Sequence, residues 1–262
     1  MFRNLLFYLV LFFAARCFAA PQEIDLANGE WPPLLGANLP QYGYASQIVS
    51  RAFALENIHV KYRFYPWKRA LDEARRGNVQ GSLLWIDNAE RRQDFLYSQP
   101  VYRSKVVLFF NRDRPIDWSQ LDDLKGHRLG VTHGYYYGKA LTQLIQSQQL
   151  QSDIGINDAQ NFAKLLAKRI DAFPCEEAVG MHLIRHNLGS KALEQINIST
   201  QIIHEEPMYL LISRKTPNAE LLLQRFNQGL AKMHASGELN AILNGCPTAL
   251  RQKYASLIRK GC

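Results

Sequence analysis

The chain has 262 residues, of which 47% are apolar and 21% charged, and its formal net charge is +8. This length suits one large domain or two modest ones. Lysine and arginine are scattered without a long basic run, which argues against nucleic-acid binding and leaves attraction of anionic ligands as the expected use of the charge. No cysteine or histidine spacing is typical of zinc, and we expect no metal site and no cofactor.

Residues 1–20 have the pattern of a secretory signal peptide. Arg3 gives a positive start, an apolar run follows, and small residues offer cleavage after Ala19 or Ala20. The apolar run is short for a bilayer-spanning helix, and Arg16 interrupts it. We therefore expect a soluble, exported protein that resides in the periplasm.

The first part of the chain alternates between the periods of strands and helices. Strands are expected at residues 23–27, 59–64 and 80–85, with a helix after each of the first two. This β-α-β-α-β order predicts parallel strands with right-handed crossovers. The loop after the first strand carries Trp31, either as an aromatic wall for a ligand or as an ordinary packed loop tryptophan.

A candidate anion site follows the third expected strand. That strand ends in Trp85, and a polar turn leads to Arg91 and Arg92. A guanidinium group offers a planar fork of donors that matches a carboxylate with two parallel hydrogen bonds. A solvated surface helix is the alternative reading of these two arginines.

The next part of the chain predicts a second set of alternating elements. Apolar strands are expected at residues 105–110 and 208–213, flanking a strand at residues 127–131 that leads into Gly134, Tyr135 and a helix through Leu150. A glycine turn at a helix start is friendly to anions, because backbone N–H groups point outward there.

Three further elements complete the pattern. Asp158 is expected to cap a helix, and a strand at residues 169–173 precedes Glu176 and another helix. A long amphipathic helix from Pro217 and a short one from Gly237 close the chain. The two apolar strands on either side of the middle region would form a hinge if both passed between two lobes.

Five motifs occur in an order that resembles the periplasmic solute-binding proteins of family 3, which bind polar amino acids. They are W-P-P at 31–33, P-W-K-R-A-L at 66–71, G-N-V-Q-G-S-L-L-W at 77–85, E-R-R-Q-D-F-L-Y-S-Q-P at 90–100 and the C-terminal helix pair at 225–243. The resemblance implies a type II periplasmic binding protein with two α/β lobes and a two-strand hinge. Lobe 1 would comprise residues 21–110 and 211–262, and lobe 2 residues 111–210.

The resemblance also implies roles for individual residues. Arg91 would hold the ligand's α-carboxylate and Glu176 its ammonium group, although a glutamate in the first turn of a helix is also common for helix stability. The turn at Gly134 and Tyr135 would hold more of the carboxylate, and Trp31 and Trp85 would line the sides. Better-known amino-acid binders carry threonine or serine shortly before the arginine, where this chain has Ile86.

The implied function is capture of a small polar solute, an amino acid or a relative, for delivery to the permease of an ABC importer. We expect a monomer with no catalytic residue. One alternative is a periplasmic dehydratase-like enzyme, with Glu176 or His133 as acid or base. Another is a soluble subunit that senses a ligand for a membrane receptor.

Three cysteines, Cys175, Cys246 and Cys262, would remain after removal of the leader. An oxidising compartment makes one disulfide plausible. The closeness of Cys246 and Cys262 in the tail predicts that these two pair. A bond from Cys175 to Cys246 is the alternative, and it would link opposite lobes.

Overall fold

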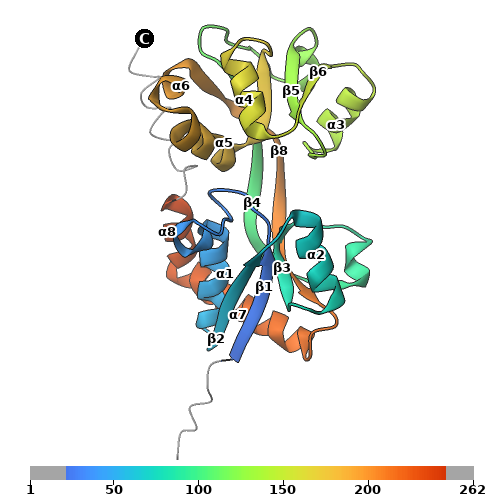
Figure 1. Ribbon diagram of the computed structural model, residues 1–262, viewed down its shortest axis with the longest axis vertical. Coiled ribbons are helices and arrows are strands. Elements are labelled where there is room, and N and C mark those ends of the chain that lie inside the picture. The colour runs from blue at the N-terminus through green and yellow to red at the C-terminus, as the bar shows by residue number, and fades with distance from the viewer. Residues whose placement is uncertain (1–21, 246–262) are drawn as a thin grey trace, which may run out of the picture.

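The computed structural model describes residues 22–245, so the expected signal peptide and the expected Cys246–Cys262 disulfide lie outside the described residues. Two α/β lobes are stacked along the long axis, and two long strands, β4 and β8, run between them (Figure 1). The expected architecture of two α/β lobes is thereby confirmed. Among the described residues, no helix is both long and apolar enough to cross a bilayer.

The first lobe is built from both ends of the described chain. Its strands are β1 (Gln22–Asn28), β2 (Ile58–Phe64) and β3 (Gly81–Trp85), and its helices are α1 (Tyr44–Ala54), α2 (Trp67–Arg76), α7 (Ala219–Ser236) and α8 (Glu238–Gly245). Short 3-10 turns cover Pro40–Tyr42 and Arg91–Gln93. Its core centres on Phe53 of α1 and Phe226 of α7, whose ring centroids lie 5.0 Å apart.

The second lobe lies between the two long strands in sequence. Its strands are β5 (Arg128–Thr132), β6 (Gln151–Gly155) and β7 (Ala172–Glu176), and its helices are α3 (Lys139–Gln146), α4 (Asp158–Leu166), α5 (Glu177–Leu183) and α6 (Ser190–Gln195). A 3-10 turn covers Leu121–Leu124, and α5 continues as one π-helical turn, Ile184–Leu188. Fully buried Phe109, Phe162 and Phe173 form its aromatic core.

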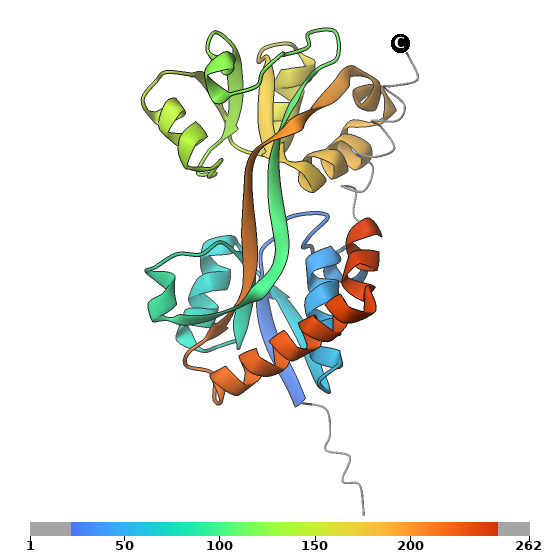
Figure 2. The ribbon, with the colours of Figure 1, turned by 180° about the vertical axis from the view of Figure 1, so that it is seen from behind.

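Strands β4 (Phe95–Asn111) and β8 (Ile196–Ser213) are antiparallel and tie the lobes into one sheet of order β2-β1-β3-β8-β4-β7-β5-β6. Seen from behind, they cross the gap side by side (Figure 2). In the first lobe β3 pairs with β8, and in the second lobe β4 pairs with β7 from Val106 onward. Each crossing strand therefore belongs to both lobes.

Several elements differ from the expectation. The two apolar strands extend far beyond residues 105–110 and 208–213, and the helix expected to run through Leu150 ends at Gln146. Strand β6, which has no clean apolar alternation, was not expected. The cap of α4 is Asn157, whose side chain accepts a hydrogen bond from the Gln160 N–H, so the expected capping by Asp158 is wrong.

Candidate functional site

The directions of the strands place the candidate site residues of lobe 1 opposite those of lobe 2. Strand β8 runs from lobe 2 to lobe 1, and β3 is antiparallel to it, so β3 and its parallel neighbour β1 point toward lobe 2. Strand β4 runs the other way, so β7 and its parallel neighbour β5 point toward lobe 1. The carboxyl ends of β1, β3, β5 and β7 therefore border the space between the lobes, which is where open α/β sheets bind ligands.

In lobe 1 three tryptophans form a continuous row at this edge. Trp31, in the loop after β1, lies edge-on to Trp67 at 6.4 Å between ring centroids, and Trp67 lies edge-on to Trp85 at 5.3 Å. Trp67 reaches the row because residue 29 is glycine: a Cβ atom there would come within 2.4 Å of the Trp67 ring. The row offers an aromatic wall made from three separate segments of the chain.

The end of β3 is bent in a way that fixes Trp85. Pairing of β3 with β8 shifts register between Ser82 and Trp85, and the buried Leu84 between them has a φ of 57°. A left-handed leucine is strained, and such strain clusters at functional sites. Trp85 Nε1 donates a 2.8 Å hydrogen bond to Ser82 Oγ, which holds the indole in place.

Arg91 closes the tryptophan row. Its guanidinium carbon lies 4.8 Å from the centroid of the Trp85 ring, a cation–π distance, and Nη1 donates a 3.3 Å hydrogen bond to the Ile86 carbonyl. Asn88 Oδ1 accepts from the Arg91 backbone N–H and shapes the turn. Within residues 22–245, no carboxylate forms an ion pair with Arg91.

The neighbouring Arg92 is placed quite differently. It donates two hydrogen bonds to Asp87, of 2.8 and 2.7 Å, and stacks on the Tyr97 ring. Both side chains of the pair are about half exposed. Arg92 is thus a paired surface charge, whereas Arg91 keeps donors for another acceptor.

The facing edge of lobe 2 carries the loop after β5. Gly134 has a φ of 77°, and Tyr135 is 48% exposed. The Tyr135 N–H is already used, because it donates to the Thr132 carbonyl. Helix α3 begins only at Lys139, so the glycine turn does not open the helix directly, contrary to the expectation. The Tyr137 hydroxyl accepts from the Thr132 N–H and anchors the loop.

Glu176 stands at the junction of β7 and α5, on the same edge of lobe 2. It is 6% exposed, and both of its carboxylate oxygens are engaged. Oε1 accepts from the Tyr102 hydroxyl at 2.7 Å, and Oε2 accepts from the Val179 N–H at 2.9 Å as the cap of α5. Burial raises the Glu176 pKa to about 7, and these hydrogen bonds hold it lower than burial alone would.

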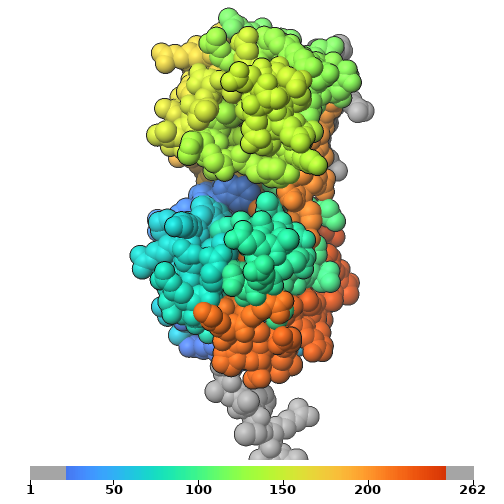
Figure 3. Space-filling model, turned by 90° about the vertical axis from the view of Figure 1, so that its right-hand side faces the viewer, coloured from blue at the N-terminus to red at the C-terminus, as the bar shows by residue number. Residues whose placement is uncertain are grey.

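The six candidate residues therefore form two groups. Trp31, Trp85 and Arg91 meet in one row on lobe 1, and Gly134, Tyr135 and Glu176 lie on the facing edge of lobe 2. The space-filling view shows the molecule hollowed between the lobes, with blue atoms of the early chain visible in the hollow (Figure 3).

Two residues that sequence reasoning did not assign to the site belong beside it. Trp67 was given no site role from the sequence, although its position shortly after the end of β2 and directly after Pro66 was a signal for an edge role. Tyr102 lies in the crossing strand, where no motif marked it as the partner of Glu176.

Solved structures of other proteins share this two-lobed α/β fold. An ancestral arginine-binding protein bound to arginine superposes with a TM-score of 0.66 at 17% identity, covering 87% of this chain and 99% of that one. The second substrate-binding domain of GlnP from Lactococcus lactis, in an open conformation, gives 0.67 at 19%, covering 85% and 94%. A histidine kinase sensor domain gives 0.66 at 19%, covering 86% and 96%. The architecture is that of type II periplasmic binding proteins.

The family is shown by the sequence itself. Residues 29–245 match the model of the bacterial extracellular solute-binding proteins, family 3, and the chain belongs to that family. No protein of curated function matches it. The match ends at the last residue that the structure describes.

Proposed function

We propose that the protein captures an amino acid, or a close relative with a carboxylate, between its two lobes. The observation that carries the proposal is the position of Arg91. Its guanidinium stacks on Trp85 at the edge that faces lobe 2, and within the described residues no carboxylate neutralises it. A stacked, unneutralised guanidinium is well suited to bind a carboxylate with two parallel hydrogen bonds.

The second lobe supplies the complementary groups. Glu176 would meet the ligand's ammonium group, and its existing bonds to Tyr102 and the α5 N-terminus fix the carboxylate for that contact. The Gly134–Tyr135 turn would hold more of the ligand's carboxylate, with Gly134 as the backbone donor because the Tyr135 N–H is bonded to Thr132, and the tryptophan row would cover the ligand's side. Because these groups lie on two lobes, ligand binding would favour the form in which the lobes approach.

We infer that binding, without chemistry on the ligand, is the activity, and that delivery to the permease of a periplasmic ABC importer is its purpose. Family membership supports this role. A sensing role on the same fold is the second candidate, favoured by the likeness to a histidine kinase sensor domain. The ligand site would be the same in both roles, so it can be tested before the partner is known.

A thermal-shift screen of amino acids, polyamines and organic acids tests the proposal, because a ligand that binds only the folded state raises the melting temperature by mass action. We expect a hit among amino acids, loss of the shift in Arg91→Ala, and retention of it in Arg92→Ala. A hit confined to polyamines, which carry no carboxylate, would refute the proposed ligand class.

A further inference from the structure

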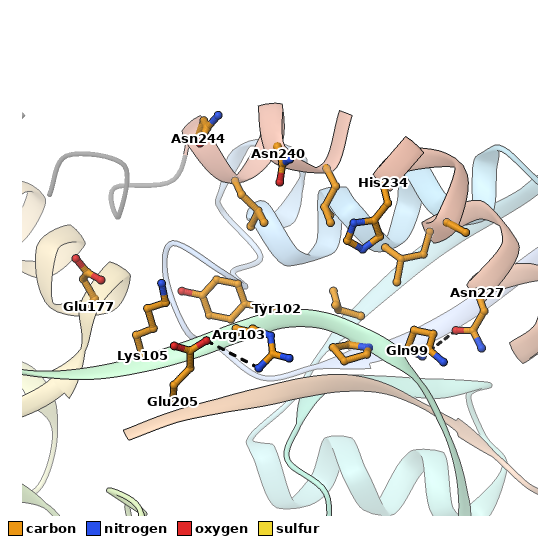
Figure 4. A pocket seen from close by; sticks show the side chains of 16 residues that line it. Gln99, Tyr102, Arg103, Lys105, Glu177, Glu205, Asn227, His234, Asn240 and Asn244 are labelled. Atoms are coloured by element: carbon orange, nitrogen blue, oxygen red, sulfur yellow. Dashed lines mark hydrogen bonds and ion pairs between the residues drawn. The ribbon is translucent and has the colours of Figure 1, made fainter. Parts of the chain in front are cut away.

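Helix α5 leads into a pair of histidines that the proposed ligand site does not use. The helix begins at the gap between the lobes, where Glu177 in its first turn lines a hollow of about 790 Å³ formed with β4, α7 and α8 (Figure 4). His182 follows in the last turn of α5, and His186 lies in the π-helical turn Ile184–Leu188 that continues it. Neither histidine lines that hollow, so the pair is a separate feature of lobe 2.

The backbone places the two imidazole rings side by side. On an α-helix, which has 3.6 residues per turn, residues four apart are neighbours on one face. A π-helical turn holds more residues, so the fourth residue moves closer to directly above the first. The helix changes from α to π between His182 and His186, and the centroids of their rings are 4.5 Å apart, with 36° between the ring planes.

This separation is the one that two ligands of a single metal ion require. A histidine nitrogen binds a divalent transition metal at about 2.0–2.1 Å, which puts the centre of its ring roughly 3.2 Å from the ion. Two rings at about 90° around one ion then have centres roughly 4.5 Å apart. The centroids of His182 and His186 already have this spacing, so the backbone holds the rings where such an ion needs them.

The nitrogen atoms of both rings are available to an ion. Within residues 22–245, the imidazoles of His182 and His186 form no hydrogen bond and no ion pair, whereas His204 pairs with Glu206. His186 is exposed and His182 is half-buried, so solvent ions reach the pair. Neutral imidazole is the commonest metal ligand in proteins.

We propose that His182 and His186 together bind one divalent transition-metal ion through their imidazole nitrogens, with Cu²⁺ bound most tightly. Imidazole suits Zn²⁺, Ni²⁺ and Cu²⁺, and affinity among these ions is highest for Cu²⁺. Cu²⁺ also favours a tetragonal arrangement, in which neighbouring ligands are about 90° apart. In the described part of the chain no three metal-ligating side chains gather at one place, so water would complete the coordination of the ion.

This site departs from the expectation of no metal site, and it does not depend on the proposed amino-acid ligand. The sequence contains the spacing of four, but only the structure shows that the rings meet across the change from α-helix to π-helix. Single π-helical turns are rare and frequently occur at functional sites. An ion bound to both rings would link α5 to the π-helical turn and stabilise that turn, because metal binding is coupled to folding.

Titration with Cu²⁺ tests the proposal on the full exported chain, produced without a histidine tag. Calorimetry should show one strong site per molecule, and electron paramagnetic resonance should show two histidine nitrogens bound to that ion. His182→Ala and His186→Ala should each weaken the site by roughly 100-fold, because two linked ligands bind more tightly than either alone by about that factor or more.

His234→Ala is the matched control. His234 is also exposed on a helix, in the last turn of α7, but the residues four positions away, Leu230 and Glu238, are not histidines. This variant should keep the affinity and the two-nitrogen spectrum of the unaltered protein.

The exposed His186 decides the outcome if His182→Ala does not fold, since removal of an exposed side chain leaves the core intact. Affinity for Cu²⁺ that survives His186→Ala would overturn the proposal. So would a spectrum with a single histidine nitrogen in the unaltered protein, or loss of the site in His234→Ala.

Discussion

The hydroxyl of Tyr102, in crossing strand β4, donates a hydrogen bond to Glu176, the cap of α5 in lobe 2. This bond ties the strand that joins the lobes to the residue proposed to hold the ligand's ammonium group. Glu176 is thus both a structural cap and a candidate ligand contact. A bound ammonium group would be an additional partner of the Glu176 carboxylate, which already accepts two hydrogen bonds. The protonation state of Glu176 therefore matters for both roles.

The first prediction concerns pH and stability. The Glu176 pKa is raised from 4.5 to about 7 in the folded protein, so folding favours its protonated form. Its contribution to the free energy of unfolding is therefore most favourable below about pH 4.5, decreases as the pH rises, and is constant above about pH 7. Glu176→Gln removes this dependence. The stability of the variant minus that of the unaltered protein should therefore be larger at about pH 8 than at about pH 5. Urea unfolding of both proteins at the two pH values measures it.

Tyr102→Phe is the matched control for this experiment. It removes one donor that favours the ionised carboxylate but leaves the carboxylate itself. The pH dependence should persist in this variant and extend to higher pH. An identical stability difference between the unaltered protein and Glu176→Gln at both pH values would contradict the raised pKa.

The second prediction concerns ligand recognition by Arg91. Arg91→Ala should weaken amino-acid binding by roughly 30-fold to a few thousandfold, because an unpaired buried ligand charge costs about 2–5 kcal/mol and about 1.4 kcal/mol is tenfold. Glu176→Ala should fall in the same range. Arg91→Lys should also bind poorly, since an ammonium group cannot reproduce the guanidinium fork. Calorimetry with the best ligand from the screen gives the affinities.

Arg92→Ala serves as the control, since its exposed pair with Asp87 is worth little. If this variant lost affinity and Arg91→Ala kept it, the carboxylate would be held one residue along from the proposed position. If neither mattered, no ligand carboxylate would bind here.

The third prediction concerns lobe closure. A saturating ligand that contacts both lobes should compact the molecule through bending of β4 and β8. The pairing of these two strands shifts register between Tyr97 and Tyr102 of β4, and we expect the bend there. Small-angle scattering should show a smaller radius of gyration with ligand, and Arg91→Ala should show no change at the same ligand concentration. An unchanged radius in a protein that calorimetry shows to be saturated would argue against closure.

The fourth prediction concerns the cysteines. We expect Cys246 and Cys262 to form a disulfide, and a closed loop of about 15 residues contributes roughly 3 kcal/mol in the chain-entropy model. Among the described residues Cys175 forms no disulfide, and it is 3% exposed within β7. Peptide mapping without reductant should recover the two tail cysteines joined; a link from Cys175 to either of them would disprove the pairing.

Local periodicity predicted lobe 1 well because its strands and helices each carry a clear apolar face. It failed for strands that do not have one buried face and one exposed face. Strand β6 (Gln151–Gly155) is mostly exposed and so shows no alternation. The crossing strands include Arg103, Lys105 and the run His204–Glu206, which are polar because they bridge two lobes through solvent-facing space. Residue patterns within one segment do not report such a span.

The site was predictable to the extent that each residue follows a strand end. Arg91, Trp31 and Glu176 were proposed as ligand contacts because their types and positions resemble those of a known family. The Trp31–Trp67–Trp85 row was not, since its contacts join three separate segments and depend on the missing side chain at Gly29. Likewise, only tertiary structure shows that Arg92 pairs with Asp87, whereas no carboxylate of the described part of the chain pairs with Arg91.

The tryptophan row also provides an intrinsic spectroscopic probe of the candidate site. Three of the four tryptophans in the chain are in the row, and the fourth, Trp118, is buried in lobe 2 with its indole N–H bonded to Ser199. Indoles held edge to face couple their excited states, so we expect the row on this one face to contribute to the tryptophan band of the near-ultraviolet circular dichroism. Events at that face can therefore be followed spectroscopically in the unlabelled protein, with Trp118 as a built-in background.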